Sequence, residues 1–147
     1  MVWEFKTFDE LTKAELYAAL QLRVEVFVVE QSCVFQDLDG SDDCAMHLLG
    51  KRDGQLVAYA RCFAAGVKFA EASIGRVVSH ANVRGTGMGH VLMQEAIARL
   101  QQHWGKQAIR IGAQAHLENF YMQHGFVDAG APYVEDGIDH LEMLRPA

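Results

Sequence analysis

Three glycines at alternating positions, Gly85, Gly87 and Gly89, stand between an apolar run and a long amphipathic segment. Because glycine has no Cβ atom, the backbone of such a loop can pass close to a ligand and point several N–H groups at one spot. The N-terminus of the helix that follows adds positive potential, and Arg84 adds a permanent positive charge. These residues predict a cradle for an anion, and the guanidinium beside it is suited to a pyrophosphate.

Two widespread phosphate-binding motifs do not fit this loop. A dinucleotide-binding fingerprint needs a glycine where His90 stands, and a mononucleotide P-loop needs Gly-Lys followed by Ser or Thr, which is absent. A glycine-rich turn that merely begins a helix is the plainer alternative. The loop must therefore be judged together with the elements around it.

The cysteines and histidines do not have the spacing of a metal site. The chain has three cysteines and seven histidines, with no Cys-x-x-Cys and no His-x-x-x-His pair, so we expect reduced thiols and no metal. Residues 31–43 are rich in aspartate, but glycine stands fourth rather than sixth when counted from Asp37, unlike an EF-hand loop. A solvated acidic loop is the prediction for that segment.

Composition and charge limit the class of protein. The chain has 147 residues, of which 50% are hydrophobic and 22% charged, and this predicts one globular domain over residues 1–147. A formal net charge of −6 without a basic stripe argues against a nucleic-acid partner. The sequence shows no apolar run of roughly 20 residues and no secretory leader, so we expect no membrane span and a cytoplasmic protein.

Hydrophobic periodicity divides the chain into strands and helices in the order β-α-β-β-β-α-β-α-β-β. The predicted strands cover residues 3–8, 46–51, 56–63, 72–79, 108–113, 126–133 and 138–144. The predicted helices cover residues 12 to about 30, 87–104 and 117–124, the last one closed by Gly125.

Local signals support several of these boundaries. Thr12 and Glu15 have the spacing of a capping box, and the helix that they begin has an apolar stripe at Leu16, Leu20, Val24 and Phe27. The second helix repeats apolar residues at Met88, Leu92, Ala96, Leu100 and Trp104. Asp-Gly dipeptides at 53–54 and 136–137 predict two hairpin turns.

Two motifs resemble one known family. Residues 84–89, Arg-Gly-Thr-Gly-Met-Gly, match the Arg-x-x-Gly-x-Gly motif of the GNAT superfamily of N-acetyltransferases, and residues 117–126 resemble its second motif, which ends in Tyr-x-x-x-Gly-Phe. Residues 27–31 and 113–117 resemble the bacterial ElaA branch in particular. The resemblance covers essentially the full length. It implies the α/β (α+β) GNAT fold, a mixed, mostly antiparallel central sheet of about six to seven strands, splayed in the middle and flanked by about four helices.

The resemblance implies acetyl-CoA as co-substrate and a primary amine of a small molecule or peptide as acceptor. Val77 and Val78 would form a β-bulge that binds the pantetheine arm as an added strand does, and a backbone N–H near Val78 would stabilise the oxyanion. Gln114 stands where many relatives have asparagine. The coenzyme-binding residues implied in this way are Val77, Val78, Arg84, Gly85, Thr86, Gly87, Met88, Gly89, Gln114, Asn119 and Tyr121.

The same resemblance implies that Tyr121 is the general acid, because a phenol can return a proton to a thiolate of similar basicity. A purely packed aromatic ring is the alternative. The base stays open, since the strand that carries Glu or Asp in many relatives has Arg76 and Ser79 instead. The candidate bases, acting directly or through water, are Glu30, His47 and His140.

Charged side chains leave the acceptor open as well. The acidic residues 37–43, with Glu135 and Asp136, would attract a cationic amine, whereas Arg23 and Arg61 would suit a carboxylate-bearing acceptor if they reach the cleft. A non-catalytic acyl-CoA-binding sensor is the alternative function, and a scaffold for protein partners is a third. Edge strands near the C-terminus would allow a homodimer.

Overall fold

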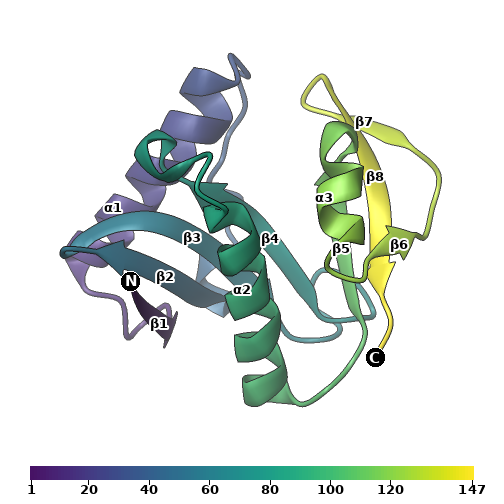
Figure 1. Cartoon of the computed structure of the whole chain (residues 1–147), viewed down its shortest axis with the longest axis horizontal. Helices are drawn as coiled ribbons and strands as arrows, with labels where there is room; N and C mark the ends of the chain where they lie inside the picture. The colour runs from purple at the N-terminus through teal and green to yellow at the C-terminus, as the bar shows by residue number, and fades with distance from the viewer.

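Two antiparallel sheets of four strands each form the body of the structure (Figure 1), a computed structural model that covers residues 1–147. The first sheet has the order β1-β2-β3-β4, with β1 (Val2–Thr7), β2 (Met46–Arg52), β3 (Gln55–Phe63) and β4 (Ser73–Ser79). In the second sheet β8 (Ile138–Arg145) pairs with β5 (Ile109–Gln114), β6 (Val127–Asp128) and β7 (Tyr133–Glu135). A mixed fold with mostly antiparallel strands is therefore confirmed.

The two sheets meet where β4 and β5 begin. Ala72, just before β4, forms a parallel bridge with Ile109, and the Arg110 N–H donates to the Ala72 carbonyl at 2.8 Å. Beyond this bridge the strands diverge (Figure 1), so the edge of β4 that faces β5 has no strand partner. The expected splay is confirmed, although it separates two sheets with eight strands in all rather than opening one sheet of about six to seven.

The additional strand arises because the predicted strand at 126–133 is interrupted. Gly130 and Pro132 lie between β6 and β7, and proline lacks the N–H that a strand ladder needs. Both short strands pair with β8. β7 joins β8 through Asp136 and Gly137, whose φ values of 52° and 75° confirm the predicted hairpin turn.

Three α-helices flank the sheets, against the four or so that the resemblance implied: α1 (Lys13–Val24), α2 (Met88–Trp104) and α3 (Glu118–Met122). A π-helical turn, Glu25–Glu30, follows α1 directly, so residues 13–30 form one helical arm that ends where the sequence predicted. α1 and α2 cover opposite faces of the first sheet, and α3 lies beside β5 (Figure 1). No helix is long and apolar enough to cross a membrane.

The start of α1 was predicted correctly, but its buried face was not. The Thr12 side chain accepts the Glu15 N–H at 3.1 Å, and the Glu15 carboxylate accepts the Thr12 N–H at 2.9 Å, so the capping box is confirmed. The buried residues of α1 are Glu15, Ala19, Leu22 and Arg23, whereas the predicted stripe of Leu16, Leu20 and Val24 is only half-buried. Hydrophobic periodicity mispredicted this face because it assumes that charged residues are exposed, whereas both of these are paired. Glu15 pairs with Lys6 and Lys51, and Arg23 pairs with Asp37 and Asp42.

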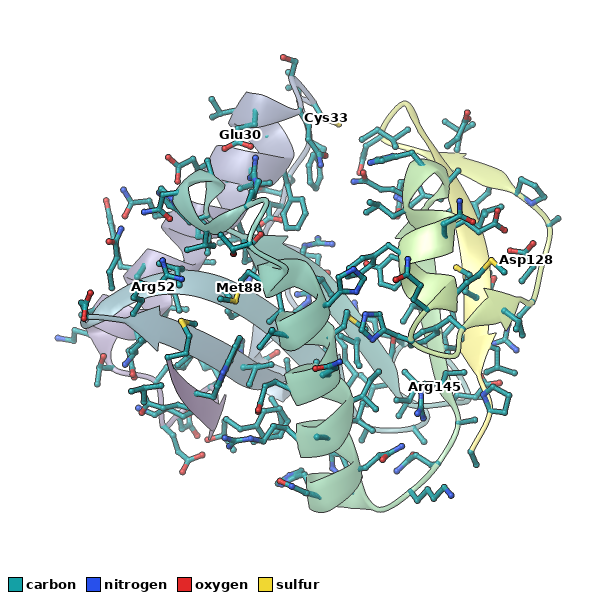
Figure 2. The ribbon with its side chains drawn as sticks, in the orientation of Figure 1. Glu30, Cys33, Arg52, Met88, Asp128 and Arg145 are labelled. Atoms are coloured by element: carbon teal, nitrogen blue, oxygen red, sulfur yellow. The ribbon has the colours of Figure 1, made fainter.

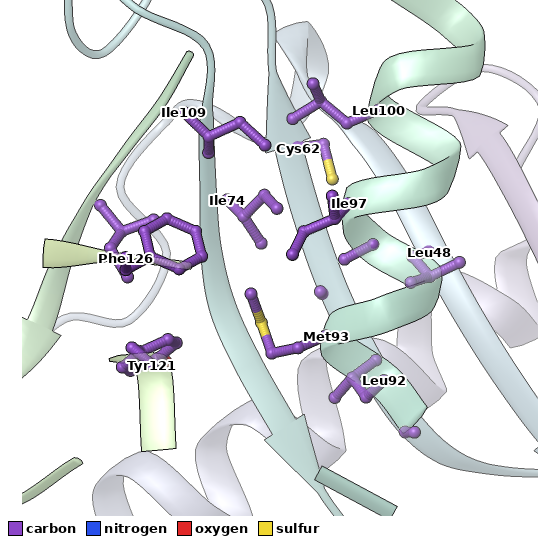
Figure 3. Close-up of a cluster of buried hydrophobic side chains, with 14 of the residues drawn as sticks. Leu48, Cys62, Ile74, Leu92, Met93, Ile97, Leu100, Ile109, Tyr121 and Phe126 are labelled. Atoms are coloured by element: carbon purple, nitrogen blue, oxygen red, sulfur yellow. The ribbon is translucent and has the colours of Figure 1, made fainter. Parts of the chain in front are cut away.

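The core is continuous even though the sheet is not. α2 buries Met88, Leu92, Ala96 and Leu100, as predicted, together with Met93 and Ile97. These side chains pack on Ile74 of β4 and, across the gap, on Ile109, Tyr121 and Phe126 of the second half (Figure 3). Each fully buried aliphatic side chain contributes about 1.5–3 kcal/mol. The shared core thus holds the two sheets together beneath the point where their strands separate.

The acidic segment after the helical arm is a largely exposed loop, as the sequence predicted, but two of its carboxylates, Asp37 and Asp42, are buried or half-buried in ion pairs. Asp37 is 2% exposed and pairs with the Nε atoms of Arg23 and Arg76 at 2.9 Å each. Asp42 accepts from Arg23 at 2.7 Å and from Arg61 at 3.0 Å. The sequence could not reveal these pairs because the cations lie on other elements, and a buried carboxylate is tolerated only when such partners are present.

Candidate functional site

A cavity of about 1010 Å³ opens where β4 and β5 diverge. Both sheets contribute to its wall, together with the start of α2, the end of the helical arm and the β7–β8 hairpin. Representative lining residues are Val78 on β4, Ile111 on β5, Leu92 on α2, Tyr121 on α3, Glu30 on the arm and Glu135 on the hairpin. The cavity therefore collects side chains from segments that lie far apart in the sequence.

The glycine loop lies beside this cavity and is open. Gly85 and Gly87 have φ values of 77° and 81°, and a Cβ atom added to either would meet no other atom within 4 Å. The first hydrogen bond within α2 runs from the Val91 N–H to the Gly87 carbonyl, at 3.2 Å. The preceding N–H groups, those of Met88, Gly89 and His90, have no partner within the helix. The loop thus offers free donors and empty space, which fits a pyrophosphate.

Arg84 at the mouth of the loop is already engaged by the helical arm. Its Nη1 atom lies 2.7 Å from Oε2 of Glu30, and its Nη2 atom donates to the Ser79 carbonyl at 3.2 Å. Figure 2 shows Glu30 near the end of the arm, above the start of α2, which Met88 marks. A pyrophosphate at this loop must compete with the Glu30 carboxylate for the guanidinium.

A β-bulge interrupts the pairing of β3 with β4. Tyr59 stands opposite Val78 and Arg61 opposite Gly75, so two residues of β4, Arg76 and Val77, oppose one residue of β3. The bulge lies one residue earlier than the predicted Val77–Val78. Arg76 has a φ of 47°, a left-handed conformation that costs a non-glycine residue about 1–3 kcal/mol, and its guanidinium is anchored on Asp37.

Tyr121 lines the cavity from α3. Its ring packs edge-to-face on Phe120 and on Phe126, with centroid distances of 5.1 and 5.9 Å, and 8% of the residue stays exposed. Burial raises the pKa of the phenol to about 12. The hydroxyl is therefore protonated throughout the neutral range, which is the state that a general acid needs.

The two histidines among the candidate bases have different surroundings. His47 is 1% exposed, and its Nδ1 and Nε2 atoms lie 2.6 Å from the Tyr59 hydroxyl and 2.8 Å from the Asp42 carbonyl, away from the cavity lining. His140 lines the cavity, and its Nδ1 lies 2.7 Å from the Ile138 carbonyl. Since a carbonyl only accepts, Nδ1 carries the proton of the neutral ring. Nε2 then has no hydrogen-bond donor beside it and can accept a proton, with Oε2 of Glu135 3.8 Å away.

Residues 13–145 match the family described as "Acetyltransferase (GNAT) domain". The chain belongs to the GNAT acetyltransferase family. It is 42% identical to the ElaA protein of Escherichia coli K12 over 145 residues, which are 97% of this chain and 95% of ElaA. The crystal structure of an acyl-CoA N-acyltransferase from Pseudomonas aeruginosa matches with a TM-score of 0.92 and 44% identity over 99% of both chains. That of E. coli ElaA matches with a TM-score of 0.89 and 41% identity over 98% of both chains.

The GNAT cavity gathers most, but not all, of the predicted site residues. Val77, Val78, Arg84, Gly89, Gln114, Tyr121, Glu30 and His140 line it. Gly85, Thr86 and Gly87 are exposed in the adjoining loop, and the Thr86 hydroxyl donates to the Val83 carbonyl. Met88 has its side chain in the core, 7% exposed, and Asn119 is exposed on α3 outside the lining. No group of His, Cys, Asp or Glu side chains is arranged to hold a metal.

Sequence reasoning missed the contacts that join the two halves of the GNAT chain over this cavity. The Cys33 thiol donates to the Asp136 carbonyl at 3.0 Å, and the Gln114 amide donates to the Gln31 side chain at 3.3 Å. Figure 2 shows Cys33 just past the helical arm, on the side that faces the C-terminal half. Contacts between residues separated by 83 and 103 positions leave no signal in local periodicity.

Glu30→Gln is expected to strengthen coenzyme binding, because it releases Arg84 from its ion pair. Both side chains are partly exposed, so the pair is worth at most about 1 kcal/mol, and the dissociation constant for CoA should fall by up to about fivefold. Titration calorimetry with CoA measures this. Glu25→Gln, in the same π-helical turn but beside His80 rather than in the Arg84 ion pair, is the matched control and should leave the dissociation constant unchanged. Weaker binding in Glu30→Gln would show that the carboxylate supports the coenzyme site instead.

The stability of the fold should depend on pH through His47. Burial lowers the pKa of this imidazole below its ordinary value of 6.5, so the unfolded chain binds the proton more readily. The resulting stability is present above pH 6.5 and is lost as the pH falls through the lowered pKa, by about 1.4 kcal/mol per unit of pKa difference. Melting temperatures from pH 8 to pH 5 should fall less steeply in His47→Gln. His124, whose pKa burial also lowers, should leave a residual slope of the same sign.

Proposed function

We propose that this GNAT chain transfers the acetyl group of acetyl-CoA to a primary amine of a small molecule or peptide, by direct attack of the amine on the thioester. One observation supports this most strongly. A single cavity runs from the Arg84 guanidinium, beside the open glycine loop, along the bulged β4 strand to Tyr121. The open glycine loop, the unpaired edge of β4 and the buried phenol of Tyr121 therefore border one space, which is what this reaction would need.

Several residues are suited to hold the coenzyme. The free N–H groups of Met88, Gly89 and His90, together with Arg84, would bind its pyrophosphate. The unpaired edge of β4 at Val77 and Val78 would bind the pantetheine arm through backbone hydrogen bonds, as an added strand does. Gln114, at the end of β5, would orient the amide groups. The thioester of the bound coenzyme supplies an activated acyl group.

The chain's own groups would then move two protons. The amine nitrogen forms a bond to the carbonyl carbon while the carbon–sulfur bond breaks, and the amine must give up a proton to a base. Glu30 and Nε2 of His140 are the two candidate bases that line the cavity. Tyr121 would donate its hydroxyl proton to the departing sulfur, and a backbone N–H of the bulge near Val78 would stabilise the negative charge that develops on the carbonyl oxygen.

Two measurements test this function together. CoA at 100 times its dissociation constant should stabilise the fold by about 2.7 kcal/mol, seen as a rise in melting temperature. Thiol release from acetyl-CoA across a panel of primary amines should then depend on the amine. Stabilisation without turnover for any amine would instead indicate an acyl-CoA sensor, and the absence of both would indicate a scaffold.

A further inference from the structure

A cluster of cations occupies the end of the cavity opposite the glycine loop. Arg61 stands opposite Gly75 near the start of β4, whereas Arg84 follows the end of that strand. Arg61, Lys68 and Arg76 all line the cavity there, and each lies within 4 Å of the carboxylate of Asp39. The pyrophosphate loop cannot account for this second cationic group, because the length of β4 separates the two.

The charges of this cluster do not balance. Arg23, Arg61, Lys68 and Arg76 share the carboxylates of Asp37, Asp39 and Asp42, so four cations face three anions. Three of the four aspartates of the acidic segment that the sequence suggested as an attractant for a cationic amine are thus engaged by these cations, and the fourth, Asp43, is exposed outside the ion pairs. An additional negative group is the ligand that this end of the cavity favours.

Lys68 is the cation best placed to take that group. Its ammonium lies 2.7 Å from the Ser41 hydroxyl and, at the longer distance of 3.4 Å, from the Asp39 carboxylate. A third of its side chain is exposed. An ammonium has three donors, so at least one is available to a ligand. Arg61, which is 3% exposed, also has a buried Nε atom without a hydrogen-bond partner.

Aromatic rings beneath these cations favour an acceptor with an apolar part. Arg61 and Lys68 lie 5.1 and 5.2 Å from the centroid of Phe63, and Phe69 adds a second ring to the lining. The β7–β8 hairpin forms another part of the wall and is acidic, with Glu135 and Asp136 in the lining beside His140. One wall of the cavity is therefore cationic and apolar, and another is anionic.

We propose that the acceptor is an amino-carboxylate, an amine whose other end bears a carboxylate and whose body is partly apolar, such as a peptide or an ω-amino acid. The carboxylate binds at Lys68 and Arg61, the apolar part packs on Phe63 and Phe69, and the amine lies toward the acidic hairpin and Tyr121. This inference rests on the proposed function for the identity of the reacting group, but the carboxylate site itself is a property of the cavity.

Matched acceptors test the proposal directly. Glycyl-phenylalanine and 6-aminohexanoate are each compared with their carboxamides and with the diamine cadaverine in acetyl-CoA-dependent thiol release. We expect kcat/KM to be at least about tenfold higher for each carboxylate than for its amide, because hydrogen bonds to charged groups are the stronger kind. Equal or higher values for the amides or for cadaverine would overturn the proposal.

Charge reversal at Lys68 tests the site itself. Lys68→Glu should reduce the ratio of kcat/KM for carboxylate to kcat/KM for amide by about tenfold or more, and Lys68→Gln by less. Lys106→Gln removes an exposed lysine outside the cavity and should leave the ratio unchanged. If the carboxylate-to-amide ratio is unchanged in a folded Lys68→Glu protein, Lys68 does not bind the acceptor.

Calorimetry separates failure of this inference from failure of the proposed function. With CoA bound, glycyl-phenylalanine should bind at least about tenfold more tightly than its amide, whether or not turnover follows. Binding without turnover for any amine would refute the transferase but support the carboxylate site. Turnover without preference for the carboxylate would support the transferase but refute the carboxylate site.

Discussion

Gly87→Glu is expected to abolish coenzyme binding while the chain still folds. The substitution places a carboxylate on two extra methylene groups in the open space of the loop, at the N-cap of α2 where the pyrophosphate should lie. Like charges at the same N–H groups should weaken CoA binding by at least about a hundredfold. Calorimetric titration with CoA measures the loss, and circular dichroism checks the fold.

Gly87→Ala is the matched control, because it introduces the same backbone strain without the charge. At a φ of 81° a side chain costs about 1–3 kcal/mol, so both variants should melt at a similarly lowered temperature. The alanine variant should keep most of its affinity, since no atom lies within 4 Å of the new Cβ. CoA affinity that survives in Gly87→Glu would mean that the pyrophosphate lies elsewhere.

Tyr121→Phe should lower kcat about a hundredfold, the lower end of the usual range for general acid–base catalysis. The ring and its contacts with Phe120 and Phe126 remain, so CoA affinity and melting temperature should stay close to those of the unaltered protein. Steady-state thiol release with a saturating amine measures kcat, and a thermal shift with CoA checks binding.

The pH profile gives a second readout for Tyr121. With a pKa of about 12, the phenol does not titrate between pH 6 and pH 9, so any rise in rate over that range reports the base or the amine. Tyr121→Phe should therefore lower the whole profile without shifting its midpoint. Tyr17→Phe, exposed on α1, is the control. An unchanged kcat in Tyr121→Phe would show that this residue only packs in the core and is not the general acid.

The sequence was most informative where local chemistry decides the structure. The Thr12–Glu15 capping box, the Asp-Gly turns and the apolar stripe of α2 were all predicted correctly, since each depends on residues a few positions apart. The glycine loop belongs to this group, because its backbone conformation follows from Gly85 and Gly87 themselves. The two family motifs placed these elements in the correct fold.

Features that depend on distant partners could not be predicted in this way. Arg23 belongs to the buried face of α1 only because Asp37 and Asp42 fold back onto it. His47 has the residue type of a base, but the Tyr59 hydroxyl and the Asp42 carbonyl occupy both of its ring nitrogens. The Arg84–Glu30 ion pair likewise joins segments that no periodicity connects. Charge pairing between elements, rather than hydrophobic pattern, accounts for most of these differences.

Because the strands of the two sheets are joined only by the bridge between Ala72 and Ile109, the space between β4 and β5 beyond it is open to a ligand. If the cavity had to open before a ligand could bind, the free energy of opening would reduce the affinity for every ligand. Met93 and Ile97 of α2 belong to the core that both halves share, so the cavity is already formed in the structure without a bound ligand. We therefore expect a ligand to enter by displacing the contacts at the rim, the Glu30–Arg84 ion pair and the Gln31–Gln114 hydrogen bond, without a change in the pairing of the strands.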